Sequence, residues 1–219
     1  MRSYGQYCPI ARASEILAER WTPLIIRNLM FGVDTFSALA RGVPAMSRSM
    51  LIRRLGELER AAIVDKTPKE EGRGHTYRLT DAGRDLASVI DAMGEWGETW
   101  IEVTTEHSDP GFALWAWCQV QMNRDALPQK RTLVSFRFPS EPAGNRYYWL
   151  LVEQGDAELC YSDPGGTPDI YVVADSLPFV NWHRGRLRWS EAVGSGGIKV
   201  SGDRRLARSL PTWNLGGRS

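Results

Sequence analysis

Four arginine residues and no acidic residue fall between positions 41 and 54. They are Arg41, Arg48, Arg53 and Arg54. A guanidinium group can bind a phosphate oxygen, or it can pair with the O6 and N7 atoms of guanine through two parallel hydrogen bonds. The formal net charge of the whole chain is only +1, so the total conceals this local positive cluster. The segment is a candidate surface for nucleic acid.

An amphipathic helix is expected to carry these side chains. Ser47 is a predicted N-cap, and Leu51, Leu55 and Leu58 share one face of the helix that follows. A single helix of this kind fits the DNA major groove, which is about 12 Å wide. The leucines would then brace the helix against the rest of its domain.

The opposite face of the same helix supplies the predicted DNA contacts. Ser49 and Arg53 lie away from the leucines, and we expect Arg53 to read bases. Arg48 and Ser47 at the helix start, and Arg41 in the preceding segment, are placed to bind phosphate groups.

Apolar residues at helical spacing predict further helices around this one. The predicted helical segments are 9–19, 22–31, 36–41 and 80–103. This order of helices is typical of a winged helix DNA-binding domain when a hairpin precedes the last helix. The alternative is a small α/β domain that binds protein.

A β-hairpin is expected between the basic helix and the last helix. Two short β-like runs, 63–66 and 75–79, flank a Gly-rich, charged turn. Lys69 and Arg73 of this predicted wing are expected to contact the DNA backbone or minor groove. Glu70 and Glu71 oppose that contact.

The character of the sequence changes after Ser108-Asp109-Pro110. We expect two domains, 1–107 and 108–219, because the chain exceeds the usual single domain of about 100 to 150 residues. A Trp-rich helix near 111–126 and several short strands predict a second domain of α+β class with an antiparallel sheet. The strands are expected near 132–138, 147–153, 157–161, 169–174 and 198–200.

Six tryptophans crowd this second half. They are Trp115, Trp117, Trp149, Trp182, Trp189 and Trp213. Such rings either fill a core or line an apolar ligand site. We expect Trp115, Cys118, Trp149 and Trp182 to line a ligand pocket. The alternative for each ring is core filling, and a lone buried cysteine is ordinarily a small hydrophobic residue.

Several functional classes are not supported by the sequence. The three cysteines and three histidines have no metal-binding spacing, and there is no nucleophile elbow or phosphate-binding loop. We therefore expect no catalytic site, no metal and no cofactor. The start lacks the apolar region of a signal peptide, and no apolar stretch is long enough to span a membrane. A cytoplasmic protein is expected.

Linked motifs follow one another from Cys8 to Trp100. They begin with Tyr7-Cys8-Pro9-Ile10, Glu19-Arg20-Trp21-Thr22-Pro23, Phe36-Ser37-Ala38-Leu39, Met46-Ser47-Arg48-Ser49 and Tyr77-Arg78-Leu79-Thr80-Asp81. In these motifs the chain resembles the HxlR family of MarR-like bacterial transcription regulators. The resemblance implies a winged helix-turn-helix and a homodimer on a roughly palindromic double-stranded operator. It also implies that helices at the chain ends form the dimer interface.

The family resemblance also draws attention to Cys8. Some members of the family sense thiol stress, which implies an intersubunit disulfide or modification of Cys8 by an electrophile. The alternative is a plain structural role, since no nearby positive charge would lower the pKa of this thiol.

The second half carries a separate likeness. Residues 172–177, 182–185 and 198–203 resemble the sterol carrier protein type of domain. That likeness implies an apolar cavity and a lipid-like or aromatic effector. The alternative function is a lipid-binding carrier or sensor whose first half contacts protein instead of DNA.

Overall fold

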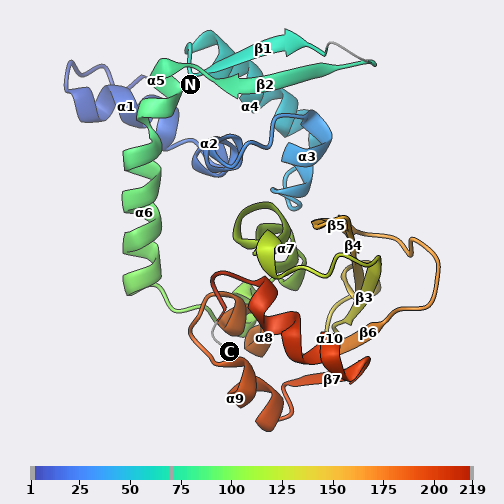
Figure 1. Ribbon diagram of the computed structural model, residues 1–219. Helices are drawn as coiled ribbons and strands as arrows, with labels where there is room; N and C mark the ends of the chain where they lie inside the picture. The colour runs from blue at the N-terminus through green and yellow to red at the C-terminus, as the bar shows by residue number, and fades with distance from the viewer. Residues whose placement is uncertain (1–2, 70–71, 218–219) are drawn as a thin grey trace. The chain divides into compact units, whose positions relative to one another are not determined.

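The computed structural model describes residues 3–69 and 72–217 (Figure 1). The chain forms two compact units, Met1–Glu102 and Val103–Ser219. Both units contain helices and strands, so the fold class is α+β. The division lies near the domain boundary expected after residue 107. Within the described residues, no helix combines the length and the apolar character needed to cross a membrane.

Helices and one hairpin build the first unit. Its elements are α1 (Pro9–Leu17), α2 (Thr22–Met30), α3 (Phe36–Arg41), α4 (Arg48–Arg60), β1 (Val64–Pro68), β2 (His75–Leu79), α5 (Asp81–Asp85) and α6 (Ala87–Trp100). Thr35, Ser47 and Thr80 each precede a helix, and each side chain accepts a hydrogen bond from the backbone amide three residues on. These caps satisfy amides that the first helical turn leaves without partners.

The apolar face predicted for α4 is buried. Leu51, Leu55 and Leu58 lie in the core of the unit, as do Ile25 and Ile26 of α2. Burial of each such side chain contributes about 1.5 to 3 kcal/mol, which fixes the rotation of α4 about its own axis. The opposite face of α4 is consequently turned to solvent.

The long helix predicted from residue 80 to 103 is two helices. The amide of Leu86 donates to the carbonyl oxygen of Gly83, three residues back, so the α-helical pattern is interrupted between α5 and α6. Gly83 also packs so closely that a Cβ atom there would lie 2.2 Å from the carbonyl oxygen of Ile63. This close packing of α5 on Ile63, which lies between α4 and β1, accompanies the break before α6.

A five-stranded sheet organises the second unit. Its strands are β3 (Thr132–Arg137), β4 (Tyr147–Glu153), β5 (Asp156–Cys160), β6 (Ile170–Ala174) and β7 (Ile198–Gly202), in the spatial order β5-β4-β3-β6-β7. The prediction of an antiparallel sheet is wrong at one pair, because β3 and β6 are parallel. Residues 161–169 return the chain to the far side of β3, so β6 starts at the same end as β3.

Helices cover one face of this sheet. They are α7 (Pro110–Ala116), α8 (Ser176–His183), α9 (Trp189–Gly194) and α10 (Arg204–Ser209) (Figure 1). The predicted Trp-rich helix ends early, since α7 passes into a π-helical turn at Trp117–Gln121. Alternate strand residues such as Val134, Phe136 and Val172 join Trp117 and Trp213 in one hydrophobic core.

Candidate nucleic-acid interface

The outward face of α4 carries a compact set of exposed side chains, of which all but one are polar or charged. Its exposed members are Ser47, Arg48, Ser49, Ile52 and Arg53. All five lie in the first two turns of the helix or at its cap. The structure therefore brings four of the predicted DNA-binding residues together on one face.

Phe36 supports the first of these arginines. The guanidinium carbon of Arg48 lies 4.9 Å from the centre of the Phe36 ring, so a cation–π contact joins the start of α4 to the start of α3. Arg41 is exposed at the end of α3. Arg27 braces the turn after it, since its Nη2 donates to the carbonyl oxygen of Gly42 at 3.2 Å. These contacts position the two arginines predicted to bind phosphate.

Arg53, the predicted base reader, is held by Glu57, which lies one turn further along α4. Nε of Arg53 donates to Oε1 of Glu57 at 3.0 Å. Burial raises the pKa of Glu57, but the hydrogen bond from Arg53 and the charges of Arg54 and Arg53 outweigh it, so the pKa lies below its ordinary value. The carboxylate stays charged and fixes one edge of the Arg53 guanidinium.

Arg54 does not belong to the exposed cluster. It is only 6% exposed, and its Nη1 lies 2.5 Å from Oε2 of Glu57 while its Nη2 lies 3.0 Å from Oε2 of Glu19. Inclusion of Arg54 in the positive surface was therefore wrong. Glu57 is itself buried, and its carboxylate pairs with both Arg53 and Arg54. The exposed charge comes from Arg41, Arg48 and Arg53.

Ile52 adds an apolar side chain to this face that was not among the predicted DNA-binding residues. Its side chain is 62% exposed between Ser49 and Arg53 on the outward face. An apolar residue on the polar face of an amphipathic helix was the available signal. An aliphatic side chain in a major groove can contact the methyl group of thymine.

The hairpin confirms the predicted wing. β1 and β2 pair antiparallel, from Val64 opposite Leu79 to Pro68 opposite His75. The Lys69 amide donates to the carbonyl oxygen of Gly74, and Arg73 is exposed in the turn. Glu70 and Glu71 lie outside the described residues.

Three of the four predicted ligand-binding residues, Trp115, Cys118 and Trp182, are buried, and Trp149 is half-buried. Trp182 is fully buried, with its ring 5.3 Å from that of Trp117 and 4.7 Å from that of Trp189. Cys118 is buried, and its Sγ donates to the carbonyl oxygen of Ala157. Burial also raises the pKa of the Cys118 thiol to about 11. This packing supports the core-filling alternative for Trp182 and Cys118.

The other two residues of that set lie elsewhere. Trp115 is buried and stacks on Phe112. Trp149 is half-buried and stacks on Tyr147, on the sheet face opposite the hydrophobic core. Both tryptophans thus stack on a neighbouring aromatic ring, and a ligand role for them stays a prediction.

Two further observations concern cysteines and metals. Cys8 is half-buried at the N-cap of α1 and has a free thiol. Among the residues that the structure describes, no three His, Cys, Asp or Glu side chains cluster as metal ligands would.

Three helices, a capped basic helix and a two-stranded wing define a winged helix-turn-helix. The model of the HxlR-like helix-turn-helix family matches residues 16–105. An uncharacterized HTH-type transcriptional regulator of Mycobacterium tuberculosis is 37% identical over 116 residues, which cover 46% of this chain and 72% of the relative. The chain belongs to the HxlR-like helix-turn-helix family.

Other relatives carry the same description. The HTH-type transcriptional regulator YodB of Bacillus subtilis is 35% identical over 97 residues, covering 43% of this chain and 87% of YodB. The solved structure of reduced YodB is 33% identical with a TM-score of 0.39, and the match covers 44% of this chain and 97% of that one. These relatives are transcriptional regulators and not enzymes. The likeness of the second unit to sterol carrier proteins stays a prediction.

Proposed function

We propose that this protein binds operator DNA as a homodimer and regulates transcription, with the second unit responding to a small molecule. The observation that carries the DNA-binding part is the orientation of α4. Its leucines are buried, and Ser49, Ile52 and Arg53 face outward together.

The contacts follow from this orientation. Arg53 presents its two terminal nitrogens to guanine O6 and N7 while Glu57 holds its Nε. Arg48 and Arg41 bind phosphate groups on either side of the groove, and Ser47 and Ser49 add hydroxyl donors. Lys69 and Arg73 contact the DNA backbone or minor groove from the wing.

An apolar stripe on α6 supports a second copy of this chain as the partner. Val89, Met93, Trp96 and Trp100 are exposed at spacings of four, three and four residues, so they share one side of the helix. Trp96 is 60% and Trp100 is 73% exposed. Self-association through a two-fold axis buries the stripe on both copies and matches the symmetry of a palindromic operator.

Cys8 belongs to the same proposal. Exposed Tyr7 and Ile10 flank it, so the chain start offers a second apolar surface for the partner copy. Packing of two copies there would bring the two Cys8 thiols together. An intersubunit disulfide, or a covalent adduct with an electrophile, would then alter the spacing of the two reading helices.

The direct connection of the second unit to α6 supports a response of this unit to a small molecule. The first unit ends at Glu102 and the second begins at Val103, directly after the dimerisation helix α6. A ligand changes DNA affinity only if it binds the DNA-competent and incompetent forms with different affinity.

Selection of random DNA duplexes by the full-length protein tests the DNA-binding proposal. The expected result is a palindromic consensus whose half-sites lie about one helical turn, roughly 10 base pairs, apart. Enrichment of no sequence, or of a single unrepeated half-site, would contradict a dimeric reader.

A further inference from the structure

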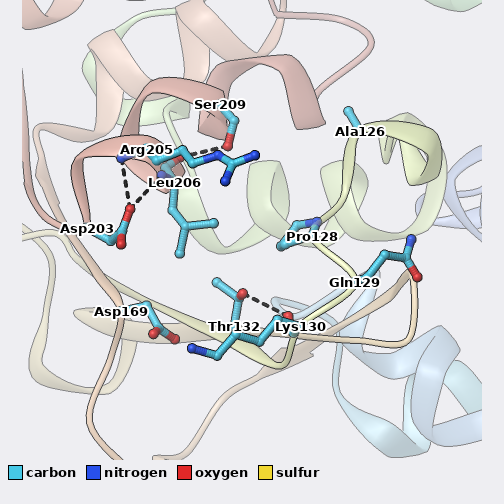
Figure 2. A pocket seen from close by; sticks show the side chains of 10 residues that line it. All are labelled: Ala126, Pro128, Gln129, Lys130, Thr132, Asp169, Asp203, Arg205, Leu206 and Ser209. Atoms are coloured by element: carbon cyan, nitrogen blue, oxygen red, sulfur yellow. Dashed lines mark hydrogen bonds between the residues drawn. The ribbon is translucent and has the colours of Figure 1, made fainter.

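A hollow of about 480 Å³ with a mixed polar and apolar lining lies at one end of the sheet in the second unit. Three separate segments enclose it: the residues before β3, the start of β6, and the corner from β7 into α10 (Figure 2). The residues that matter here are Pro128, Lys130, Asp169, Asp203, Arg205 and Leu206. None of the four predicted ligand-binding residues lines it.

Each of the two carboxylates is fixed through one oxygen. Oδ2 of Asp169 accepts a hydrogen bond from the amide of Leu133 at 2.9 Å. Oδ1 of Asp203 accepts from the amides of Arg205 and Leu206 at 2.8 and 3.0 Å. Among the described residues, no hydrogen-bond donor reaches the other two oxygens, Oδ1 of Asp169 and Oδ2 of Asp203. Two oriented acceptors therefore remain available to a ligand.

The backbone holds the two carboxylates at a constant separation. The amide of Asp203 donates to the carbonyl oxygen of Asp169 at 2.9 Å, and the amide of Asp169 donates to that of Leu133 at 2.8 Å. Gly202 has a φ of +113°, and a Cβ atom there would lie 2.2 Å from the carbonyl oxygen of Asp169. Only glycine permits this close approach, which brings the end of β7 against Asp169.

Cations and an apolar surface complete the hollow. The exposed side chains of Lys130 and Arg205 line it, and the positive charges of both lower the pKa of the Asp203 carboxyl. Pro128 and the half-buried Leu206 supply the apolar part of the wall. In Figure 2 the guanidinium of Arg205 lies on the α10 side and Lys130 lies on the β3 side.

We propose that this hollow binds a small zwitterion that carries an ammonium group, a carboxylate and a short aliphatic chain. The ammonium group binds Oδ1 of Asp169 and Oδ2 of Asp203. The carboxylate binds Lys130 and Arg205, and the aliphatic chain lies on Pro128 and Leu206. This inference rests on the small-molecule response proposed above for the second unit, and it names the class of ligand.

The charges of the hollow favour this class over the alternatives. The backbone hydrogen bonds from Leu206 and Arg205, with the nearby positive charges, hold the pKa of Asp203 below its ordinary value, so its carboxylate is charged at neutral pH. A purely apolar ligand would remove these charged groups from water without replacing their hydrogen bonds. A simple anion would pair only with the two cations of the hollow, and a simple amine would pair only with its two carboxylates.

Three probes that share one propyl chain separate these possibilities. L-norvaline carries both charged groups, pentanoate lacks the ammonium group, and butylamine lacks the carboxylate. Each is titrated into the full-length protein, with the amide resonances of Gly202 and Leu206 as reporters. The expected result is saturable, millimolar or tighter binding of norvaline, with at least about tenfold weaker binding of the other two, since each loses charge-assisted hydrogen bonds. Equal binding of all three, or no saturable binding of norvaline, overturns the proposal.

Isosteric variants test the residues. Asp169→Asn and Asp203→Asn keep an oxygen for the backbone amides that each carboxylate now binds, but they remove the charge. Asp163→Asn is the matched control, because Asp163 also accepts a backbone hydrogen bond, from Gly165, and does not line the hollow. Each of the first two variants should weaken norvaline binding about tenfold, and the control should not. Norvaline binding that survives both substitutions contradicts the assignment.

The two proposals fail in different ways. Norvaline binding by a protein that selects no DNA would preserve the hollow as a site and overturn the regulatory function. Selection of a palindromic operator without norvaline binding would preserve the function and overturn the ligand class.

Discussion

Nε of Arg53 lies 3.0 Å from Oε1 of Glu57, so the predicted base reader is already oriented before DNA binds. The same carboxylate binds the buried Arg54 through its other oxygen. Glu57 therefore joins the outward face of α4 to its inward face. An oriented guanidinium loses less side-chain entropy when it pairs with a base.

Replacement of the two exposed arginines of α4 should have effects of different kinds. Arg53→Ala should cost about 1 to 3 kcal/mol on the selected operator and relax the preference at one base pair, because it removes a bidentate base contact. Arg48→Ala should weaken binding to all sequences by a similar factor and lower the salt dependence. Fluorescence anisotropy on operator and point-substituted duplexes measures both. Full sequence preference in Arg53→Ala would show that another face of α4 enters the groove.

Loss of the Glu57 charge should affect both stability and DNA reading. Glu57→Gln leaves Arg54 buried with only Glu19 as an acidic partner, and we expect the free energy of unfolding to fall by about 1 to 3 kcal/mol. Glu59→Gln is the matched control, since Glu59 is exposed on the same helix. Denaturant unfolding measures the first effect, and anisotropy with the folded variant measures relaxed sequence preference. Equal stability of the two variants would contradict the bridging role.

The same carboxylate predicts an acid-dependent loss of stability. The folded-state pKa of Glu57 lies below its ordinary value of 4.5. The stabilisation is therefore fully present above pH 4.5 and is lost as the pH falls through the folded-state pKa. Unfolding curves of the wild-type protein and Glu57→Gln should converge over this acid range. Curves that stay parallel down to the folded-state pKa would mean that the charge is not stabilising.

The apolar stripe of α6 should control the oligomeric state. Trp96→Asp places a charge at the centre of the stripe and should convert the dimer to a monomer, with a large loss of operator affinity, because one reading helix then binds alone. Asp91→Asn, on the other side of α6, is the control. Light scattering after size-exclusion chromatography reports the mass. A dimeric Trp96→Asp protein would place the interface elsewhere.

His183 should remain neutral well below neutral pH. Burial, together with the charge of Arg184, lowers its pKa from 6.5 to about 4, and Nδ1 of His183 lies 3.3 Å from Nδ2 of Asn214. The unfolded state binds a proton more readily, so stability should fall as the pH drops from 6.5 towards 4. NMR titration of the imidazole carbons measures the pKa directly. Protonation near 6.5 would contradict the buried, neutral state.

Local sequence signals were sufficient for much of the first unit. The caps at Thr35, Ser47 and Thr80 and the leucine face of α4 depend on neighbours within one or two turns. The inward position of Arg54 could not be predicted in this way. A buried guanidinium requires an opposite charge, and one of its partners, Glu19, lies far away in the sequence.

The second unit depended more on distant contacts. Alternating apolar residues predicted its strands, but the parallel pairing of β3 with β6 is set by the path of residues 161–169. The hollow in the second unit could not be predicted from the sequence either. Its residues Lys130, Asp169 and Arg205 come from three segments that only the folded sheet brings together. Tryptophan density alone does not predict a ligand site, because Trp182 packs on Trp117 and Trp189 in the core.

The parallel pairing of β3 with β6 also constrains the order in which the chain folds during synthesis. The first unit and the β3–β4–β5 hairpins can form as soon as they leave the ribosome, but β3 gains its second neighbour only after residue 174 has emerged. Until then one side of this apolar strand offers unpaired amides and carbonyls, which invite pairing with other nascent chains. Chains that stall between β5 and β6 should therefore aggregate, although their DNA-reading unit is already complete.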